Sequence, residues 1–387
     1  MPHVTFGIIG DLHCRLATDP NDSFLQVAAP RVPPGRHPVQ ALLELIDLEN
    51  LTVDVLLVPG DLANKACREG LSQGWDYCLE IAAKLHARFI IPVIGNHDID
   101  SKRLRPQDAV FAQVRDMRPD FPFTLAANNQ SYFADGYCVI TEGDVHFIAL
   151  NTVIDHTDEA SAKRGTFSTT RIQQMEAALS QSLTAPLRIA VMHHHPILHS
   201  GTFWGDNDVI PTGDDLVASL RRLGCRLIVH GHKHIPRLTT LNGVAIFASG
   251  SFSAMLHEYG TLFGNTFHVV HVEGTQPESV KGQIKTWVFQ LGKGWRKSNE
   301  DYKGFPFVAG FGSTFSVQVI AEQLLVLAGG QLQANRFLEH EVYLAAPEIK
   351  YLTPSQREDL NQTLTPHDLK ISSPNDGQIE LWRVYRP

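Results

Sequence analysis

Aspartate, asparagine and histidine residues gather in five short strings of this sequence, and each string directly follows an apolar run. The strings are GDLH (10–13), GDLAN (60–64), GNHD (95–98), HHHP (193–196) and GHKH (231–234). Together they supply carboxylate, amide and imidazole donors without a thiolate, the donor set that suits Mn, Fe or Zn. One octahedral ion takes about six ligands. A set of this size therefore indicates two ions that share a carboxylate.

Two cations about 3.5 to 4 Å apart can hydrolyse phosphate esters. Water is a weak nucleophile at neutral pH, and the anionic oxygens of the ester repel an attacking nucleophile. A pair of cations lowers the pKa of bound water and neutralises the phosphoryl oxygens as charge develops on them. An imidazole is the usual donor of the proton that the leaving alkoxide requires. The five strings therefore predict a centre for phosphate ester hydrolysis.

The elements around the strings predict an α/β sheet that would bring them together. Near-continuous apolar runs, typical of strands covered on both faces, alternate with amphipathic helix patterns. In such a sheet the loops at the carboxyl ends of the strands converge on one crevice. The expected strands are 3–9, 53–58, 89–94, 145–150, 187–192 and 225–230, and the expected helices are 38–50, 68–87, 168–183 and 213–224.

The pattern changes after residue 242. Residues 242–290 contain successive strand patterns without helices between them, which indicates antiparallel pairing at one edge of the sheet. The polar, glycine-containing stretch 291–304 is expected to be a linker. Residues 305–387 are then a small C-terminal α+β domain, with helices at 317–330 and 353–364 and strands at 340–347 and 379–387.

Composition excludes several classes of protein. Of the 387 residues, 43% are hydrophobic and 19% are charged, which is typical of a globular protein and not of a disordered or collagen-like chain. The net charge of -8 argues against binding nucleic acid through bulk positive charge. We expect a cytoplasmic protein without a membrane span, because no apolar run approaches about 20 residues. The five scattered cysteines predict free thiols.

The order of the strings resembles the calcineurin-like metallophosphoesterase superfamily. The resemblance rests on D-x-H, G-D-x-x-N, G-N-H-D, a histidine run that ends a strand, and G-H-x-H, and Gly250-Ser251 adds a further match. It implies a four-layer α/β/β/α sandwich over residues 1–290, with the metals at the strand ends. It says nothing about the C-terminal domain.

The resemblance also implies roles for individual residues. His97 corresponds to the catalytic histidine and Asp98 to the carboxylate that orients it. Among the three consecutive histidines we choose His194, since the family's ligand usually lies two residues before a proline, here Pro196. The first ion would be held by Asp11, His13, Asp61 and His234, and the second by Asp61, Asn96, His194 and His232.

The expected function is hydrolysis of a small-molecule phosphodiester, such as a cyclic nucleotide, with two Mn, Fe or Zn ions as cofactors. One alternative is a nuclease on DNA or RNA whose C-terminal domain docks a protein partner. Another is a non-catalytic scaffold in which the phosphoesterase domain itself is the protein-binding surface. Arg15 is a candidate contact for the substrate phosphate, although a solvated loop arginine is the simpler interpretation. Phe203 and Trp204 are candidates for a wall of the substrate cleft, with packing at its rim as an equal alternative.

Overall fold

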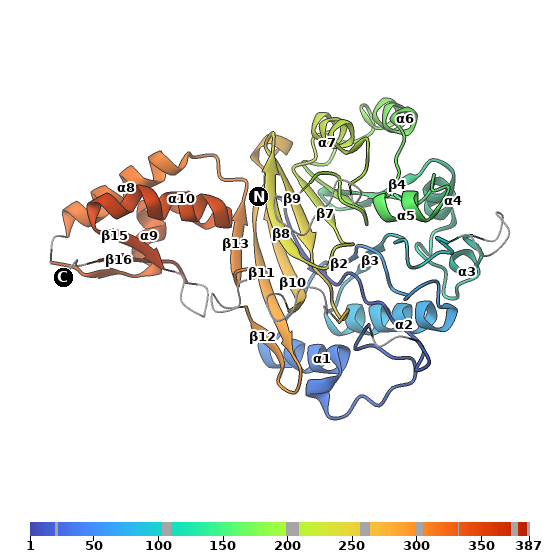
Figure 1. Ribbon diagram of the computed structural model, residues 1–387. Coiled ribbons are helices and arrows are strands. Elements are labelled where there is room, and N and C mark those ends of the chain that lie inside the picture. Colours follow the sequence, from blue (N-terminus) through green and yellow to red (C-terminus); the bar gives the residue numbers. More distant parts are fainter. Residues whose placement is uncertain are drawn as a thin grey trace.

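The computed structural model describes residues 1–19, 22–102, 110–198, 209–255, 264–298, 305–331, 333–372 and 378–384. Within these ranges the chain forms two large sheets, a small third sheet, and helices that cover them (Figure 1). No helix in the described ranges has the length and apolar character needed to cross a bilayer.

The first sheet has seven strands and carries the first three strings. Its order is β12-β11-β10-β1-β2-β3, and β13 pairs with β11 beside β12. Strands β1, β2 and β3 run parallel, whereas β10 pairs antiparallel with β1. The strands are β1 (His3–Ile8), β2 (Val55–Val58), β3 (Phe89–Pro92), β10 (Asn265–Glu273), β11 (Lys281–Gln290), β12 (Gly294–Lys297) and β13 (Val308–Phe311).

The second sheet has six strands and carries the last two strings. Its order is β4-β5-β6-β7-β9-β8, and β5, β6, β7 and β9 run parallel. The strands are β4 (Tyr137–Glu142), β5 (Val145–Leu150), β6 (Leu187–Val191), β7 (Leu227–His230), β8 (Pro236–Leu241) and β9 (Val244–Ser249).

The two sheets pack face to face, which explains the continuous apolar runs. In β5, Phe147 and Ala149 belong to the core between the sheets, whereas Ile148 and Leu150 belong to a second core under helices. The Phe6 and Phe147 rings meet edge to face across the two sheets, with centroids 6.3 Å apart. Both faces of the inner strands are therefore buried.

Helices cover the outer face of each sheet and complete four layers. Helices α1 (Pro38–Glu49) and α2 (Arg68–Lys84) lie on the outer side of the first sheet, and α6 (Thr169–Leu179) and α7 (Gly213–Arg222) lie outside the second (Figure 1). This arrangement confirms the predicted four-layer α/β/β/α sandwich. Shorter helices α3 (Ala112–Arg115), α4 (Ala126–Ala134) and α5 (Glu159–Arg164) lie in the connections.

The first sheet extends beyond the expected boundary at residue 290. Strand β12 lies inside the stretch 291–304, which was expected to be a linker, and β13 lies inside the expected C-terminal domain. Trp295 is 4% exposed, packs on Phe252 and Phe289, and donates its indole N–H to Pro38 O at 2.8 Å. The polar residues around Trp295 concealed an edge strand whose single aromatic side chain faces the core.

The C-terminal domain has its own core and its own sheet. Helices α8 (Val317–Gly330), α9 (Glu339–Ala345) and α10 (Pro354–Leu364) cover one face of a three-stranded sheet in the order β14-β16-β15. The strands are β14 (Arg336–Phe337), β15 (Leu369–Ser372) and β16 (Glu380–Arg383). Buried Phe337 and Leu381 belong to this core, which is separate from the core between the large sheets.

The strand predicted at 340–347 is wrong, since most of this segment is helix α9. Its apolar residues form one short continuous run, 342–346, which favoured a strand. The Glu341 carboxylate accepts the Leu338 N–H at 2.9 Å and so completes half of a capping box that starts a helix. Val342 is fully buried, whereas Leu344 is 87% exposed.

Residue Trp295 provides a test of the revised boundary. Trp295→Ala should lower the free energy of unfolding by roughly 3 to 5 kcal/mol, because it leaves a cavity in the core. Lys293→Ala, at an exposed position in the same stretch, should change it by less than about 0.5 kcal/mol. Urea unfolding monitored by circular dichroism measures both values. Equal, small effects would show that 291–304 is a linker after all.

Candidate metal centre

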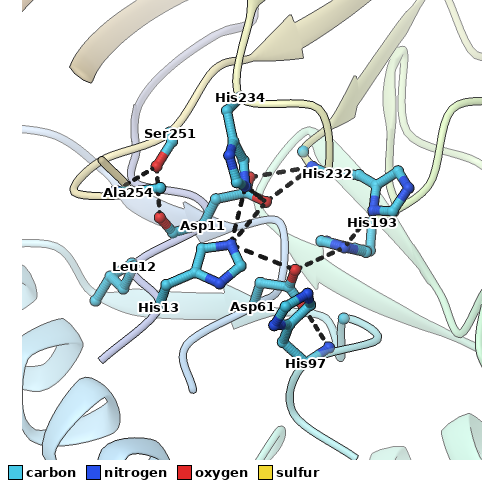
Figure 2. Close-up of polar contacts among 12 residues, drawn as sticks. Asp11, Leu12, His13, Asp61, His97, His193, His232, His234, Ser251 and Ala254 are labelled. Atoms are coloured by element: carbon cyan, nitrogen blue, oxygen red, sulfur yellow. Dashed lines mark hydrogen bonds and ion pairs between the residues drawn. The ribbon is translucent and has the colours of Figure 1, made fainter. Parts of the chain in front are cut away.

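The five strings meet at the carboxyl ends of five parallel strands. Asp11 follows β1, Asp61 follows β2, and Asn96 follows β3 in the first sheet, while His193 follows β6 and His232 follows β7 in the second. Figure 2 shows Asp11, His13, Asp61, His193, His232 and His234 pointing toward one another. The centre therefore lies where the two sheets come together.

The backbone of these loops adopts a conformation that non-glycine residues rarely take. Five candidate ligands have positive φ angles: Asp11 (54°), His13 (50°), Asp61 (54°), His232 (86°) and His234 (58°). Each such residue costs of order 1–3 kcal/mol and persists where the surroundings over-determine it, often at functional sites. The turns place these polar side chains where the loops meet, so that they face one space (Figure 2).

Hydrogen bonds between the loops hold this backbone in place. Asp11 N–H donates to Gly60 O at 3.0 Å, and His13 N–H donates to Asp61 O at 2.9 Å. On the other side, the Ser251 hydroxyl donates to Asp11 O at 2.7 Å and accepts the Ala254 N–H at 2.8 Å (Figure 2). Ser251 thus explains the Gly-Ser pair noted in the sequence, because it anchors the first loop.

Two glycines of the strings leave room for the buried carboxylates. A Cβ atom on Gly95 would collide with Asp61 Oδ1, and one on Gly231 would collide with Asp11 Oδ2. Any side chain at either position would push a carboxylate out of the centre.

The first group of donors consists of Asp11, His13 and His234. His234 Nε2 lies 3.5 Å from Asp11 Oδ1 and 2.9 Å from His13 Nε2. His13 Nε2 also lies 3.6 Å from Asp61 Oδ2. Asp11 is fully buried and accepts the His232 backbone N–H at 3.0 Å. Three donor atoms therefore face one point, with Asp61 beside them.

The second group consists of Asp61, Asn96, His193 and His232. His193 Nε2 lies 3.3 Å from Asp61 Oδ2 and 3.1 Å from Asn96 Oδ1. His232 Nδ1 lies 3.1 Å from the same Asn96 oxygen. The other ring nitrogen of His193, Nδ1, lies 2.8 Å from Pro59 O, so it carries the proton and leaves Nε2 as the donor atom.

His193 occupies the place that the sequence analysis gave to His194. His194 lies within reach of His193 and His232, but both of its ring nitrogens have protein partners: Nδ1 lies 2.8 Å from Thr152 Oγ1 and Nε2 lies 2.7 Å from Ala162 O. Because successive residues at the end of β6 face opposite sides, only alternate side chains reach Asp61. The structure favours His193 as the donor.

The Asp98 carboxylate was expected to orient the His97 ring, but its hydrogen bonds go to backbone N–H groups instead. It accepts backbone N–H groups of Asp61 (2.9 Å), Gly95 (2.9 Å) and Ala63 (2.8 Å), and thereby joins the second and third loops. His97 Nδ1 instead lies 3.3 Å from Asn64 Oδ1 and 3.2 Å from the Lys65 N–H. Asn64 is the last residue of GDLAN, and no role was predicted for it.

The carboxylates of the centre attract positive charge. Burial alone would raise the pKa of Asp61, but the adjacent His193 and His97 hold it well below its usual value. Burial alone would lower the pKa of His193, but the Asp61 carboxylate raises it to about 9. Among the described residues, the ion pairs of Asp11 and Asp61 are with histidines, not with Lys or Arg. Such a site fits cations.

The donors themselves fit a pair of cations. They comprise carboxylate oxygens, an amide oxygen and imidazole nitrogens, and Asp61 belongs to both groups. His232 directs its Nδ1 toward Asn96 Oδ1 and His193 Nε2, at 3.1 Å and 3.3 Å. These observations fit two ions bridged by Asp61.

A cavity of about 260 Å³ adjoins the centre beside His97. His97 and Asn96 line it together with Ala66, Ile99, Ala162, Ser101, three lysines and two acidic residues. The cavity is therefore continuous with the centre and open to a small ligand.

Two other sequence candidates have different outcomes. The Arg15 guanidinium donates to Ser23 O at 3.1 Å and Leu16 O at 3.0 Å, so it anchors its own loop rather than the centre. Phe203 and Trp204 lie outside the described residues.

Comparisons with known structures give matches at low identity and with TM-scores below 0.5. A dimetal phosphatase from Danio rerio has 14% identity and a TM-score of 0.47 over 73% of this chain and 95% of that one. The purple acid phosphatase PPD1 of Lupinus luteus has 17% identity and a TM-score of 0.48, over 75% of this chain and 52% of that one. GAP50, described as the anchor in the inner membrane complex of Plasmodium, has 12% identity and a TM-score of 0.44, over 77% and 89%.

Comparison with curated proteins gives no match. The family model described as "Calcineurin-like phosphoesterase" matches residues 4–236, well over half of the chain and all five strings. This match confirms the resemblance seen in the motifs, and the chain belongs to the calcineurin-like phosphoesterase family, a family of metal-dependent enzymes that hydrolyse phosphate esters.

Proposed function

We propose that this protein hydrolyses a small-molecule phosphodiester at a centre of two cations bridged by Asp61. The observation that carries the proposal is the position of Asp61, whose Oδ2 lies 3.6 Å from His13 Nε2 and 3.3 Å from His193 Nε2. One carboxylate therefore faces both groups of donors. A cytoplasmic location goes with this proposal.

Apart from the shared Asp61, each cation would have its own protein ligands. Asp11, His13, Asp61 and His234 would hold the first, and Asp61, Asn96, His193 and His232 the second. When bound, the cations neutralise the phosphoryl oxygens and lower the pKa of coordinated water. The metal is Mn, Fe or Zn, since all three accept these ligands.

His97 is placed to supply the proton that the leaving group needs. Its ring centroid lies 4.6 Å from that of His13, and it lines the cavity beside the centre. Because Nδ1 faces Asn64 Oδ1 and the Lys65 N–H, either of which can be its partner, Nε2 is the ring atom that exchanges a proton with the substrate. Burial lowers the pKa of His97 to about 4, so the ring is neutral until an anionic phosphate stabilises its protonated form.

The cavity supports a small substrate. Its volume of about 260 Å³ is just below the roughly 300–1,000 Å³ of drug-sized ligand pockets. The net charge of -8 disfavours a nucleic-acid substrate. A cyclic nucleotide or a compound of similar size is the expected class.

Metal content tests the assignment of His193. After loading with Mn²⁺ and dialysis, we expect about two ions per wild-type chain, because two ligand groups are present. His193→Ala should retain about one, whereas His194→Gln should retain two. Plasma mass spectrometry measures the ions, and circular dichroism checks that each variant is folded. A His194→Gln protein that loses an ion while His193→Ala keeps both would reverse the assignment.

Turnover of bis-p-nitrophenyl phosphate tests the activity. The Mn²⁺-loaded protein should hydrolyse it, EDTA should stop the reaction, and added Mn²⁺ should restore it. His97→Ala should lower kcat by about 10²- to 10⁴-fold, the usual contribution of a general acid.

Two variants complete this experiment. Asp61→Asn should abolish turnover because it weakens both metal sites, and the remote, exposed Lys293→Ala should match wild type. Absence of turnover with this diester and with p-nitrophenyl phosphate would refute the proposed function, and a fully active Asp61→Asn protein would refute the bridging role.

A further inference from the structure

The cavity beside His97 has a charged mouth that the proposed chemistry does not use. Lys102 and Lys163 both line it, and their ammonium groups flank a single carboxylate, Glu159. Lys102 Nζ lies 3.8 Å and Lys163 Nζ lies 3.7 Å from the same Glu159 Oε1. Both distances exceed hydrogen-bonding range. One carboxylate thus neutralises at most one of the two ammonium groups.

The third lysine of the cavity is already paired. Lys65 Nζ lies 2.9 Å from Asp22 Oδ2, and Asp22 also accepts the Asn64 side-chain amide. Apart from Lys65, the charged residues of the lining are Lys102, Lys163, Asp100 and Glu159. The ion pairs of Lys102 and Lys163 are both with Glu159, so these two lysines share one carboxylate.

The pairs with Glu159 are easily exchanged for another anion. The side chains of Lys102, Lys163 and Glu159 are 59%, 63% and 51% exposed. Exposed pairs of this kind contribute little to stability, so an incoming anion displaces Glu159 at little cost. The two ammonium groups supply six donors in total, enough for a carboxylate or a phosphate.

The position of the cavity indicates which part of the substrate would enter it. His97 lines it, and under the proposed function His97 protonates the leaving oxygen. A proton donor must lie within hydrogen-bonding reach of the atom that it protonates. The group attached to the leaving oxygen would therefore lie in this cavity, which Ile99, Ala162 and the two lysines line together with His97.

We infer that the substrate's leaving group carries a second anionic group, a carboxylate or a phosphate, which Lys102 and Lys163 bind at the mouth of the cavity. This inference rests on the proposed function and narrows its substrate class. A simple cyclic nucleotide has no second anion and would not use these lysines. Lys102 and Lys163 are specificity-determining residues, and Glu159 competes with the substrate for them.

A pair of matched diesters tests the inference. Methyl 4-carboxyphenyl phosphate and methyl 4-carbamoylphenyl phosphate have leaving groups of the same shape, one anionic and one neutral. The ratio of their kcat/KM values is measured with Mn²⁺-loaded wild type and variants, so that their intrinsic reactivities cancel. We expect Lys102→Ala/Lys163→Ala to lower this ratio about tenfold, and Glu159→Gln to raise it about two- to threefold.

The control removes the same charge elsewhere. Lys293→Ala/Lys370→Ala, at two exposed lysines outside the cavity lining, should leave the ratio at the wild-type value. A ratio that the Lys102/Lys163 variant shares with wild type would overturn the inference, while turnover of the neutral diester would still support the proposed function. Equal losses with both diesters would also overturn it, because the lysines would then act on the transferred phosphoryl group.

A binding measurement separates the two failures. Calorimetry compares the products 4-hydroxybenzoate and 4-hydroxybenzamide, which need no turnover. We expect the carboxylate to bind about tenfold more tightly to wild type, and the Lys102/Lys163 variant to lose this preference. Equal binding of the two products to wild type would overturn the inference, whereas failure to hydrolyse either diester would refute the proposed function.

Discussion

Two buried carboxylates, Asp11 and Asp61, impose the constraint on which the rest of the centre depends. Both are at most 1% exposed, and their ion pairs among the described residues are with histidines. Buried anions are costly unless positive charge compensates them. The imidazoles of His13 and His193 meet this requirement in part, and cations shared through Asp61 meet it more fully. The same positive charge is what a phosphate ester requires for hydrolysis.

The fold supplies the geometry that this constraint demands. Two parallel stretches of sheet end at the same place, so residues more than 200 positions apart, such as Asp11 and His232, are in hydrogen-bond contact. Strained turns direct the donors inward, and Ser251 and Asp98 tie the turns together through backbone hydrogen bonds. The stability of the four-layer sandwich thus compensates for a backbone that is unfavourable on its own.

Much of this arrangement could be predicted from the sequence because the motifs follow strands. Continuous apolar runs indicated strands buried on both faces, and the polar strings after them indicated one crevice. The choice between His193 and His194 could not be predicted. It depends on where strand β6 ends and its side chains stop pointing to alternate faces of the sheet. The role of Asp98 could not be predicted for a different reason. Its partners are backbone N–H groups, which every residue except proline has, so the residue types do not identify them. Strand β12 was missed because polar residues surround its one buried tryptophan.

The most direct test of the central claim is an anomalous difference map from crystals of the protein soaked in Mn²⁺. Two peaks about 3.5 to 4 Å apart should lie on either side of the Asp61 carboxylate, one against Asp11, His13 and His234 and the other against Asn96, His193 and His232. A map without a peak at Asp61, or with a single ion that Asp61 does not touch, would contradict the account.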